Sequence, residues 1–209
     1  MRLYQLFENV AAQGKTVVIF PGRFQPLHRG HAETYNALKA RFPGADVWLA
    51  TSGVVGPDSP FSFDERKALA EIMGIPGDRI MQVKSPYNPQ EILQHYNPER
   101  DTAVFALSKK DEERISYKPK KDGSPAYLQP FSNNQAMQPF KSHGYVMMAP
   151  IVQFKIAGKT ITGATQIRDM LAQGDANITA AVLKDMYGAD RFQAAAKIIL
   201  PHFPAAQAA

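Results

Sequence analysis

The segment Gly22–His31 concentrates residue types that bind phosphate. It reads Gly-Arg-Phe-Gln-Pro-Leu-His-Arg-Gly-His. Its two histidines, His28 and His31, flank Gly30 at the expected start of a helix, where backbone N–H groups are unpaired and carry partial positive charge. Two imidazoles three residues apart at that position can donate hydrogen bonds to one anion. The segment therefore predicts a site for phosphate groups and for the charge that develops in phosphoryl transfer.

The two histidines could also have a different role. A histidine is often structural or simply solvated, and two of them three residues apart could bind zinc. The chain has no cysteine, which excludes thiolate metal sites, disulfides and a cysteine nucleophile. The Gly-Lys-Ser/Thr ending of a Walker loop and the Gly-x-Gly-x-x-Gly of a dinucleotide fold are both absent.

A second segment, Ile161–Arg168, reads Ile-Thr-Gly-Ala-Thr-Gln-Ile-Arg and is predicted to open another helix. The Thr165 hydroxyl and the Arg168 guanidinium suit the oxygens of a triphosphate. A threonine before a helix is most often only a cap, so this segment alone indicates little. Its place near the expected end of the sheet favours a role together with Gly22–His31.

The two segments together resemble the signatures of the nucleotidylyltransferase superfamily, the adenylyl- and cytidylyltransferases of the HxGH type. Gly22–His31 matches G-x-F-x-P-x-H-x-G-H, and Ile161–Arg168 resembles I-S-S/G-T-x-I-R with Gly163 in place of the usual serine. With Pro60–Arg66, which reads P-F-S-F-D-E-R, the chain is closest in appearance to nicotinamide mononucleotide (NMN) adenylyltransferases. The resemblance spans about Thr16–Leu171, and the layout also resembles, more faintly, members encoded by large bacteriophages.

This resemblance implies transfer of a nucleoside monophosphate from a triphosphate to a phosphate-bearing acceptor, with release of pyrophosphate. ATP and NMN giving NAD is the first expectation. Phosphopantetheine, FMN and sugar or alcohol phosphates, the last with CTP, are alternatives. Mg²⁺ is expected to bind mainly through the triphosphate, with no metal ligand from the chain. The resemblance implies catalytic roles for His28, His31, Arg23 and Arg168, and nucleotide-binding roles for Gly22, Phe24, Gly30, Ser52, Lys109, Asp111 and Thr165.

The elements that must position these residues alternate between strand and helix. Expected strands are Thr16–Phe20, Asp46–Thr51, Arg79–Val83, Thr102–Leu107 and Tyr145–Phe154, the last interrupted by Pro150. Expected helices are Leu3–Val10, His31–Phe42, Phe63–Met73, Pro89–Tyr96, Thr165–Ala172, Asn177–Tyr187 and Ala189–Leu200. The pattern predicts an α/β fold, a Rossmann-like parallel sheet of about five strands with flanking helices and C-terminal helices. Ligands of such sheets bind at the carboxyl ends of the strands.

A length of 209 residues suits one domain with a small addition. We expect residues 1–174 to form the nucleotidylyltransferase α/β domain and residues 175–209 a C-terminal helical appendage. Residues 116–143 break the pattern, and this segment is too long for an ordinary connection. We therefore expect either a functional lid or a mobile insertion.

Composition and charge alone distinguish few of the candidate functions. The chain carries 24 Lys and Arg against 19 Asp and Glu, a formal net charge of +5, with a pI near 9.3. Lys118, Lys120 and Lys121 motivate one alternative, a catalytically silent relative that binds nucleic acid, but the sparse aromatic residues among the basic ones do not favour it. No apolar run could span a bilayer and the N-terminus is no secretory signal, so we expect a cytoplasmic protein without a membrane partner. The resemblance also allows a homo-oligomer.

Overall fold

The computed structural model describes residues 14–113, 115–133, 135–150, 152, 154–161 and 163–204. The helix expected over Leu3–Val10 lies outside these residues. No helix in the described part of the chain is long and apolar enough to cross a membrane.

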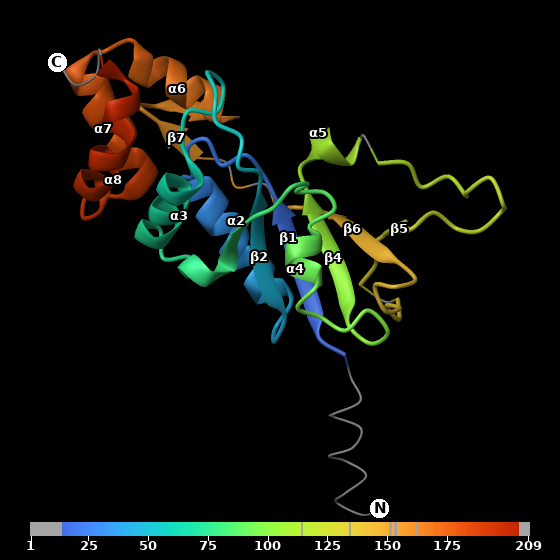
Figure 1. Cartoon of the computed structure of the whole chain (residues 1–209). Helices are drawn as coiled ribbons and strands as arrows, with labels where there is room; N and C mark the ends of the chain where they lie inside the picture. Colours follow the sequence, from blue (N-terminus) through green and yellow to red (C-terminus); the bar gives the residue numbers. More distant parts are fainter. Residues whose placement is uncertain are drawn as a thin grey trace, which may run out of the picture.

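Six parallel strands form the central sheet of the described residues, in the order β3-β2-β1-β4-β6-β5 (Figure 1). Their bounds are β1 Thr16–Pro21, β2 Asp46–Thr51, β3 Ile80–Gln82, β4 Thr102–Leu107, β5 Leu128–Pro130 and β6 Gly144–Met148. This confirms the predicted α/β class and the Rossmann-like sheet, with one strand more than the expected five. The additional strand, β5, comes from within residues 116–143 and pairs with β6 at the edge of the sheet.

The strand order reverses between β1 and β4. The chain moves from β1 through β2 to β3 on one side, then returns to place β4 on the other side of β1. Loops that leave β1 and β4 at their carboxyl ends therefore diverge and open a crevice between them.

Seven α-helices surround the sheet in the described residues. Their bounds are α2 Arg29–Arg41, α3 Phe63–Ile72, α4 Gln90–Leu93, α5 Lys109–Glu112, α6 Ala164–Ala172, α7 Ala176–Tyr187 and α8 Phe192–Ile199. Short 3-10 helices cover Gly77–Arg79 and Leu200–His202. Helix α4 covers one face of the sheet, whereas α2, α3 and the C-terminal helices cover the other.

The residues of β1 are buried alternately on these two faces, as its continuous apolar sequence predicts. Val18 and Phe20 belong to the larger core cluster, under α2 and α3, and Val17 and Ile19 to the smaller one, under α4. Burial on both faces fixes the position of β1 between the two helical layers, and so fixes where the loop after Pro21 begins.

The strand character expected over Tyr145–Phe154 belongs to two separate strands, on either side of the interruption expected at Pro150. Strand β6 ends at Met148, and a separate antiparallel hairpin follows, formed by β7 (Phe154–Ile156) and β8 (Lys159–Ile161). Pro150 has no backbone N–H to continue the ladder, which separates the two pieces. The hairpin leads directly into α6.

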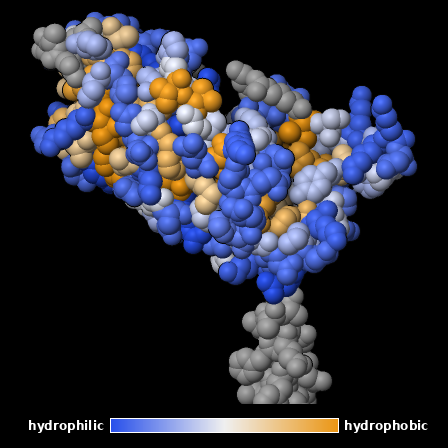
Figure 2. Space-filling model, in the orientation of Figure 1, coloured by the Kyte–Doolittle hydropathy of each residue, from blue (hydrophilic) through white to orange (hydrophobic). Residues whose placement is uncertain are grey.

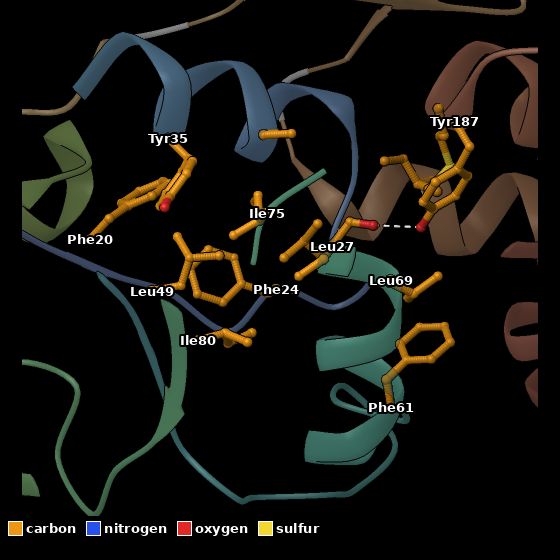
Figure 3. Packing of buried hydrophobic residues seen from close by; sticks show 14 of the residues in the cluster. Phe20, Phe24, Leu27, Tyr35, Leu49, Phe61, Leu69, Ile75, Ile80 and Tyr187 are labelled. Atoms are coloured by element: carbon orange, nitrogen blue, oxygen red, sulfur yellow. Dashed lines mark hydrogen bonds between the residues drawn. The ribbon is translucent and has the colours of Figure 1, made fainter. Parts of the chain in front are cut away.

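The C-terminal helices share the main core. Their buried residues belong to the same cluster as those of β1, α2 and α3. Figure 3 shows Tyr187 of α7 pointing toward Leu27, whose carbonyl oxygen accepts a hydrogen bond from the Tyr187 hydroxyl. In the same view Phe24 lies between Leu49 and Leu27. Residues from β2 and from α7 therefore pack against the first motif.

The segment between α5 and β5 projects away from the sheet (Figure 1), and its surface is predominantly hydrophilic (Figure 2). Lys118, Lys120 and Lys121 lie in it and are exposed. Within it, the Tyr127 hydroxyl donates to the carbonyl of Phe140.

Candidate active site

A cavity of about 550 Å³ opens at the carboxyl ends of β1, β4 and β6. Its wall includes Pro21 at the end of β1, Gly22 after it, Ser108 after β4, and Ala149 and Pro150 after β6. This is the crevice expected where the strand order reverses. Both sequence motifs reach it, because the first follows β1 and the second opens α6.

His28 and His31 sit at the start of α2 and line this cavity. The Nδ1 atom of His28 accepts a hydrogen bond from the backbone N–H of Gly30 at 3.2 Å, and Nδ1 of His31 accepts one from the N–H of His28 at 3.3 Å. This is a capping box made by two histidines, with the imidazoles in the roles that Ser and Glu usually take. The two rings stack with centroids 3.8 Å apart.

These contacts define the protonation of both rings. Burial, together with the neighbouring His31, holds the pKa of His28 well below its ordinary value. Burial lowers the pKa of His31 to about 4. Both rings are therefore neutral at neutral pH. Because each Nδ1 accepts a backbone N–H, the single proton of each ring lies on Nε2. The pair thus offers two Nε2–H donors, and neither has a partner among the described residues.

Phe24 supports the pair from the core side. It has a positive φ of 51°, and its ring packs edge-on against His31 at a centroid distance of 5.0 Å. Only 2% of Phe24 is exposed. Gly22 leaves room for this ring, since a Cβ there would lie 2.8 Å from it. Both residues line the cavity, but the main contact of the Phe24 ring is its packing against His31.

Phe154, the first residue of β7, closes the other side of the pair. Its ring lies 5.1 Å from that of His28, and a Cβ on Gly30 would come within 2.7 Å of its Cε1. Glycine at position 30 therefore lets the hairpin approach the start of α2. Phe154 was not identified from sequence, because nothing in local spacing relates it to the first motif.

The second motif presents the N-terminus of α6 to the cavity. Gly163 is the N-cap of α6 and makes no side-chain cap, and Gly163 and Ala164 both line the wall. An ideal Cβ at Gly163 would meet no atom within 4 Å, so the position is open. Uncapped N–H groups at a helix start favour an anion.

Arg168 joins the two motifs. Its Nη1 donates to the carbonyl oxygen of Gln25 at 2.8 Å, and its Nη2 to the Thr165 hydroxyl at 3.3 Å. Gln25 belongs to the loop after β1. The structure thus brings the predicted Arg168 and Thr165 beside the first motif, although neither side chain lines the cavity.

Seven of the eleven predicted site residues line this cavity. Of the eleven candidates, Gly22, Phe24, His28, Gly30, His31, Lys109 and Asp111 line it, whereas Arg23, Ser52, Thr165 and Arg168 do not. Lys109 belongs to α5, and Asp111 accepts a hydrogen bond from the Ser108 hydroxyl at 2.6 Å. The roles of all these residues stay predictions.

Arg23 and Ser52 lie to one side of the cavity. Arg23 is exposed, and its backbone carbonyl faces inward. Ser52 lines a separate hollow of about 520 Å³ at the carboxyl ends of β2 and β3. The buried side chain of Arg66 donates hydrogen bonds to both of their carbonyl oxygens.

Comparison with known proteins agrees with this architecture. Residues 19–120 match a family model described as Cytidylyltransferase-like. Phosphonoformate cytidylyltransferase of Streptomyces viridochromogenes is 31% identical over 108 residues, a match covering 44% of this chain and 56% of that protein. The chain thus matches little more than half the length of this curated relative.

Two solved structures are similar at 15% identity. Plasmodium falciparum nicotinic acid mononucleotide adenylyltransferase complexed with NaAD has a TM-score of 0.54, with 90% of this chain and 98% of that chain covered. A bifunctional NMN adenylyltransferase/ADP ribose pyrophosphatase from Francisella tularensis has a TM-score of 0.50, covering 90% and 50%. Residues 19–120 are therefore similar to cytidylyltransferases, and the chain shares the fold of these two adenylyltransferases.

Proposed function

We propose that this chain is a nucleotidylyltransferase, which transfers a nucleoside monophosphate from a triphosphate to a phosphate or phosphonate oxygen. The observation that carries the proposal is the convergence of donors on one cavity. The neutral His28 and His31 offer two Nε2–H groups, the uncapped start of α6 offers backbone N–H groups, and Lys109 adds a cation. Donors of this kind bind the oxygens of a polyphosphate.

The proposed reaction needs no covalent bond between the protein and its substrates. An acceptor oxygen forms a bond to the α-phosphorus while the bond from that phosphorus to the bridging oxygen breaks, and the electron pair leaves with pyrophosphate. A phosphate or phosphonate oxygen is already ionised at neutral pH, so no general base is needed. Catalysis then depends on holding both substrates in line and stabilising the charge that builds on the phosphates.

The histidine pair can stabilise the negative charge that builds on the phosphates in the transition state. Each neutral imidazole carries its proton on Nε2 and can donate it in a hydrogen bond, while its Nδ1 accepts a backbone N–H that fixes the ring. The donors are therefore oriented before the substrate arrives, which is the arrangement that stabilises a transition state at small reorganisation cost. Thr165 and Arg168, in the first turns of α6, are proposed to hold the far end of the triphosphate.

Mg²⁺ fits this site as an ion carried by the nucleotide. In the part of the chain that the structure describes, no three His, Asp or Glu side chains form a group that could hold a metal. Asp111, at the cavity wall, is the carboxylate that would contact the hydrated ion. When bound, Mg²⁺ supplies charge neutralisation to the triphosphate and its leaving group.

Two substrate pairs are the leading candidates. The form of the first motif and of Pro60–Arg66 favours ATP with NMN, giving NAD. The relative from Streptomyces favours CTP with phosphonoformate as the second candidate. Either pair ends in the same bond change at the α-phosphorus, so the protein groups proposed above serve both.

Pyrophosphate release, measured with Mg²⁺ for ATP and CTP each paired with NMN, nicotinic acid mononucleotide, phosphonoformate and phosphopantetheine, tests the proposal. We expect one pair to exceed all others, and His31→Ala to abolish most of that signal. Silence with every pair, together with salt-sensitive binding to DNA or RNA, would instead favour a nucleic-acid-binding relative.

A further inference from the structure

Arg66 is a fully buried arginine that touches three segments of the carboxyl edge of the sheet. Its Nη1 donates to the Thr51 hydroxyl at 2.7 Å and to the carbonyl of Arg23 at 3.2 Å. Its Nη2 donates to the carbonyl of Ser52 at 2.8 Å, and its Nε to that of Ser62 at 3.1 Å. Only 1% of the residue is exposed.

This guanidinium has no carboxylate in an ion pair among the described residues. The neighbouring Glu65 directs its carboxylate elsewhere, accepting from the Ser62 N–H at 2.7 Å and contacting Nε2 of His202 at 2.6 Å. A buried cation without a counterion is costly, and its hydrogen bonds offset only part of that cost. An apolar side chain would fill the same space more cheaply if packing were its whole role.

The four acceptors explain what the cation does. Arg23 lies in the loop after β1, between two residues that line the cavity with the histidine pair, Gly22 and Phe24. Ser52 lines the hollow after β2. One planar group therefore joins the rim of the proposed polyphosphate site to the rim of the neighbouring hollow.

We propose that Arg66 is a positioning residue for nucleotidyl transfer, holding the loop after β1 against the loop after β2 so that the phosphate donors keep their place. This inference rests on the proposed function. Arg66 touches no substrate in this role; it acts through the backbone of Arg23 and Ser52. Lysine cannot replace it, because one ammonium cannot follow the fork that reaches both carbonyl oxygens.

The test compares Arg66→Met and Arg66→Lys with a matched structural arginine. Arg79 pairs with Asp46 at 2.9 Å and lies over the Trp48 ring, at the amino end of β2 and away from the cavity. Arg79→Met therefore measures what losing a structural arginine does to stability alone. Thermal melting, kcat, KM for the triphosphate and calorimetric binding of pyrophosphate are measured for all variants.

We expect Arg66→Met to lower kcat about tenfold or more, because small misplacements of reacting groups cost that much or more. Its melting temperature should fall further than that of Arg79→Met, because several buried acceptors lose their donor. The kcat values are therefore compared well below both melting temperatures, where that of Arg79→Met stays within about twofold of the wild type. Arg66→Lys should remain impaired at least about fivefold. If Arg66→Met does not fold, Thr51→Val, which removes one acceptor at nearly constant volume, is expected to lower kcat by a few fold.

The results separate this inference from the proposed function. If the wild type is active and the kcat of Arg66→Met equals that of Arg79→Met, the positioning role is overturned and nucleotidyl transfer stands. The same follows if Arg66→Lys has the kcat of the wild type. A wild type silent with every substrate pair overturns nucleotidyl transfer. In that case, weaker pyrophosphate binding by Arg66→Met than by Arg79→Met still supports the tie between the loops, and equal binding overturns it.

Discussion

The stacked histidines act as a unit at the residue scale. Each Nδ1 accepts a backbone N–H, His28 from Gly30 in the first turn of α2 and His31 from the N-cap His28, so the start of the helix holds both rings. Stacking at 3.8 Å disfavours charging both rings together, since two like charges at that distance repel. Two neutral donors are the stable state of the pair until an anion arrives.

His31→Ala tests the donor role directly. We expect kcat to fall about a hundredfold, the usual effect of losing one oriented transition-state donor. Stability should fall modestly, by about 1 kcal/mol, because the His28 N–H loses the acceptor that completes the capping box. Steady-state kinetics and thermal melting measure the two effects.

His95→Ala is the matched control, because His95 is exposed in the turn after α4. It should match the wild type in both measurements. A His31→Ala enzyme with near-normal kcat would remove the proposed donor from the mechanism.

The pH dependence of stability follows from the same ring. Burial lowers the pKa of His31 from 6.5 to about 4, so between these values the unfolded chain binds a proton that the folded chain does not. Stability should therefore fall as pH drops from about 6.5 toward 4. Thermal melting from pH 7.5 to 5 should show a smaller decline for His31→Gln than for the wild type. Parallel curves would contradict the lowered pKa.

At the scale of elements, the start of α2 and the β7–β8 hairpin meet at Gly30. Alanine has a higher helix propensity than glycine, so Gly30→Ala would stabilise an isolated helix. Here the new Cβ would lie 2.7 Å from the Phe154 ring, which must move. We expect lower stability and a KM for the triphosphate raised about tenfold.

Gly56→Ala is the control for that substitution, since a Cβ at Gly56 meets nothing within 4 Å. It should leave melting and kinetics unchanged. If Gly30→Ala instead gains stability at unaltered KM, the hairpin does not limit the shape of the cavity.

The elements that sequence predicted well are those with a local signal. Strand β1 is a continuous apolar run, and the first motif follows it without a gap, so both could be located from spacing alone. The β7–β8 hairpin has three-residue strands, too short for alternation to be recognised. Its turn, Ala157-Gly158, has positive φ at both residues but lacks the Asn-Gly or Asp-Gly signal of such turns.

The same distinction applies to the site. His28, His31 and Gly30 lie within one motif, and their grouping follows from the sequence itself. Phe154 and Arg66 act through contacts across long stretches of chain, with Gly30 and with the carbonyl of Arg23. Such contacts depend on the folded arrangement of loops, which no local pattern encodes.

At the scale of the whole molecule, the C-terminal helices brace the loop that carries the histidines. Tyr187 is 2% exposed, and burial raises the pKa of its hydroxyl well above the ordinary value. The hydroxyl therefore stays protonated and donates to the carbonyl of Leu27, the residue before His28. Through this bond, α7 can influence the position of the first motif.

Tyr187→Phe removes only that hydroxyl and leaves the Leu27 carbonyl buried without a partner. A lost buried hydrogen bond of this kind costs about 1–3 kcal/mol. Because 1 kcal/mol corresponds to about 2–4 °C for a chain of this size, melting should fall by several degrees. Tyr117→Phe, whose hydroxyl contacts Glu112 in a partly buried position, should shift melting by less. If α7 also holds the histidine loop, Tyr187→Phe will lower kcat measured well below its melting temperature, whereas a bond that matters only for stability will leave kcat unchanged.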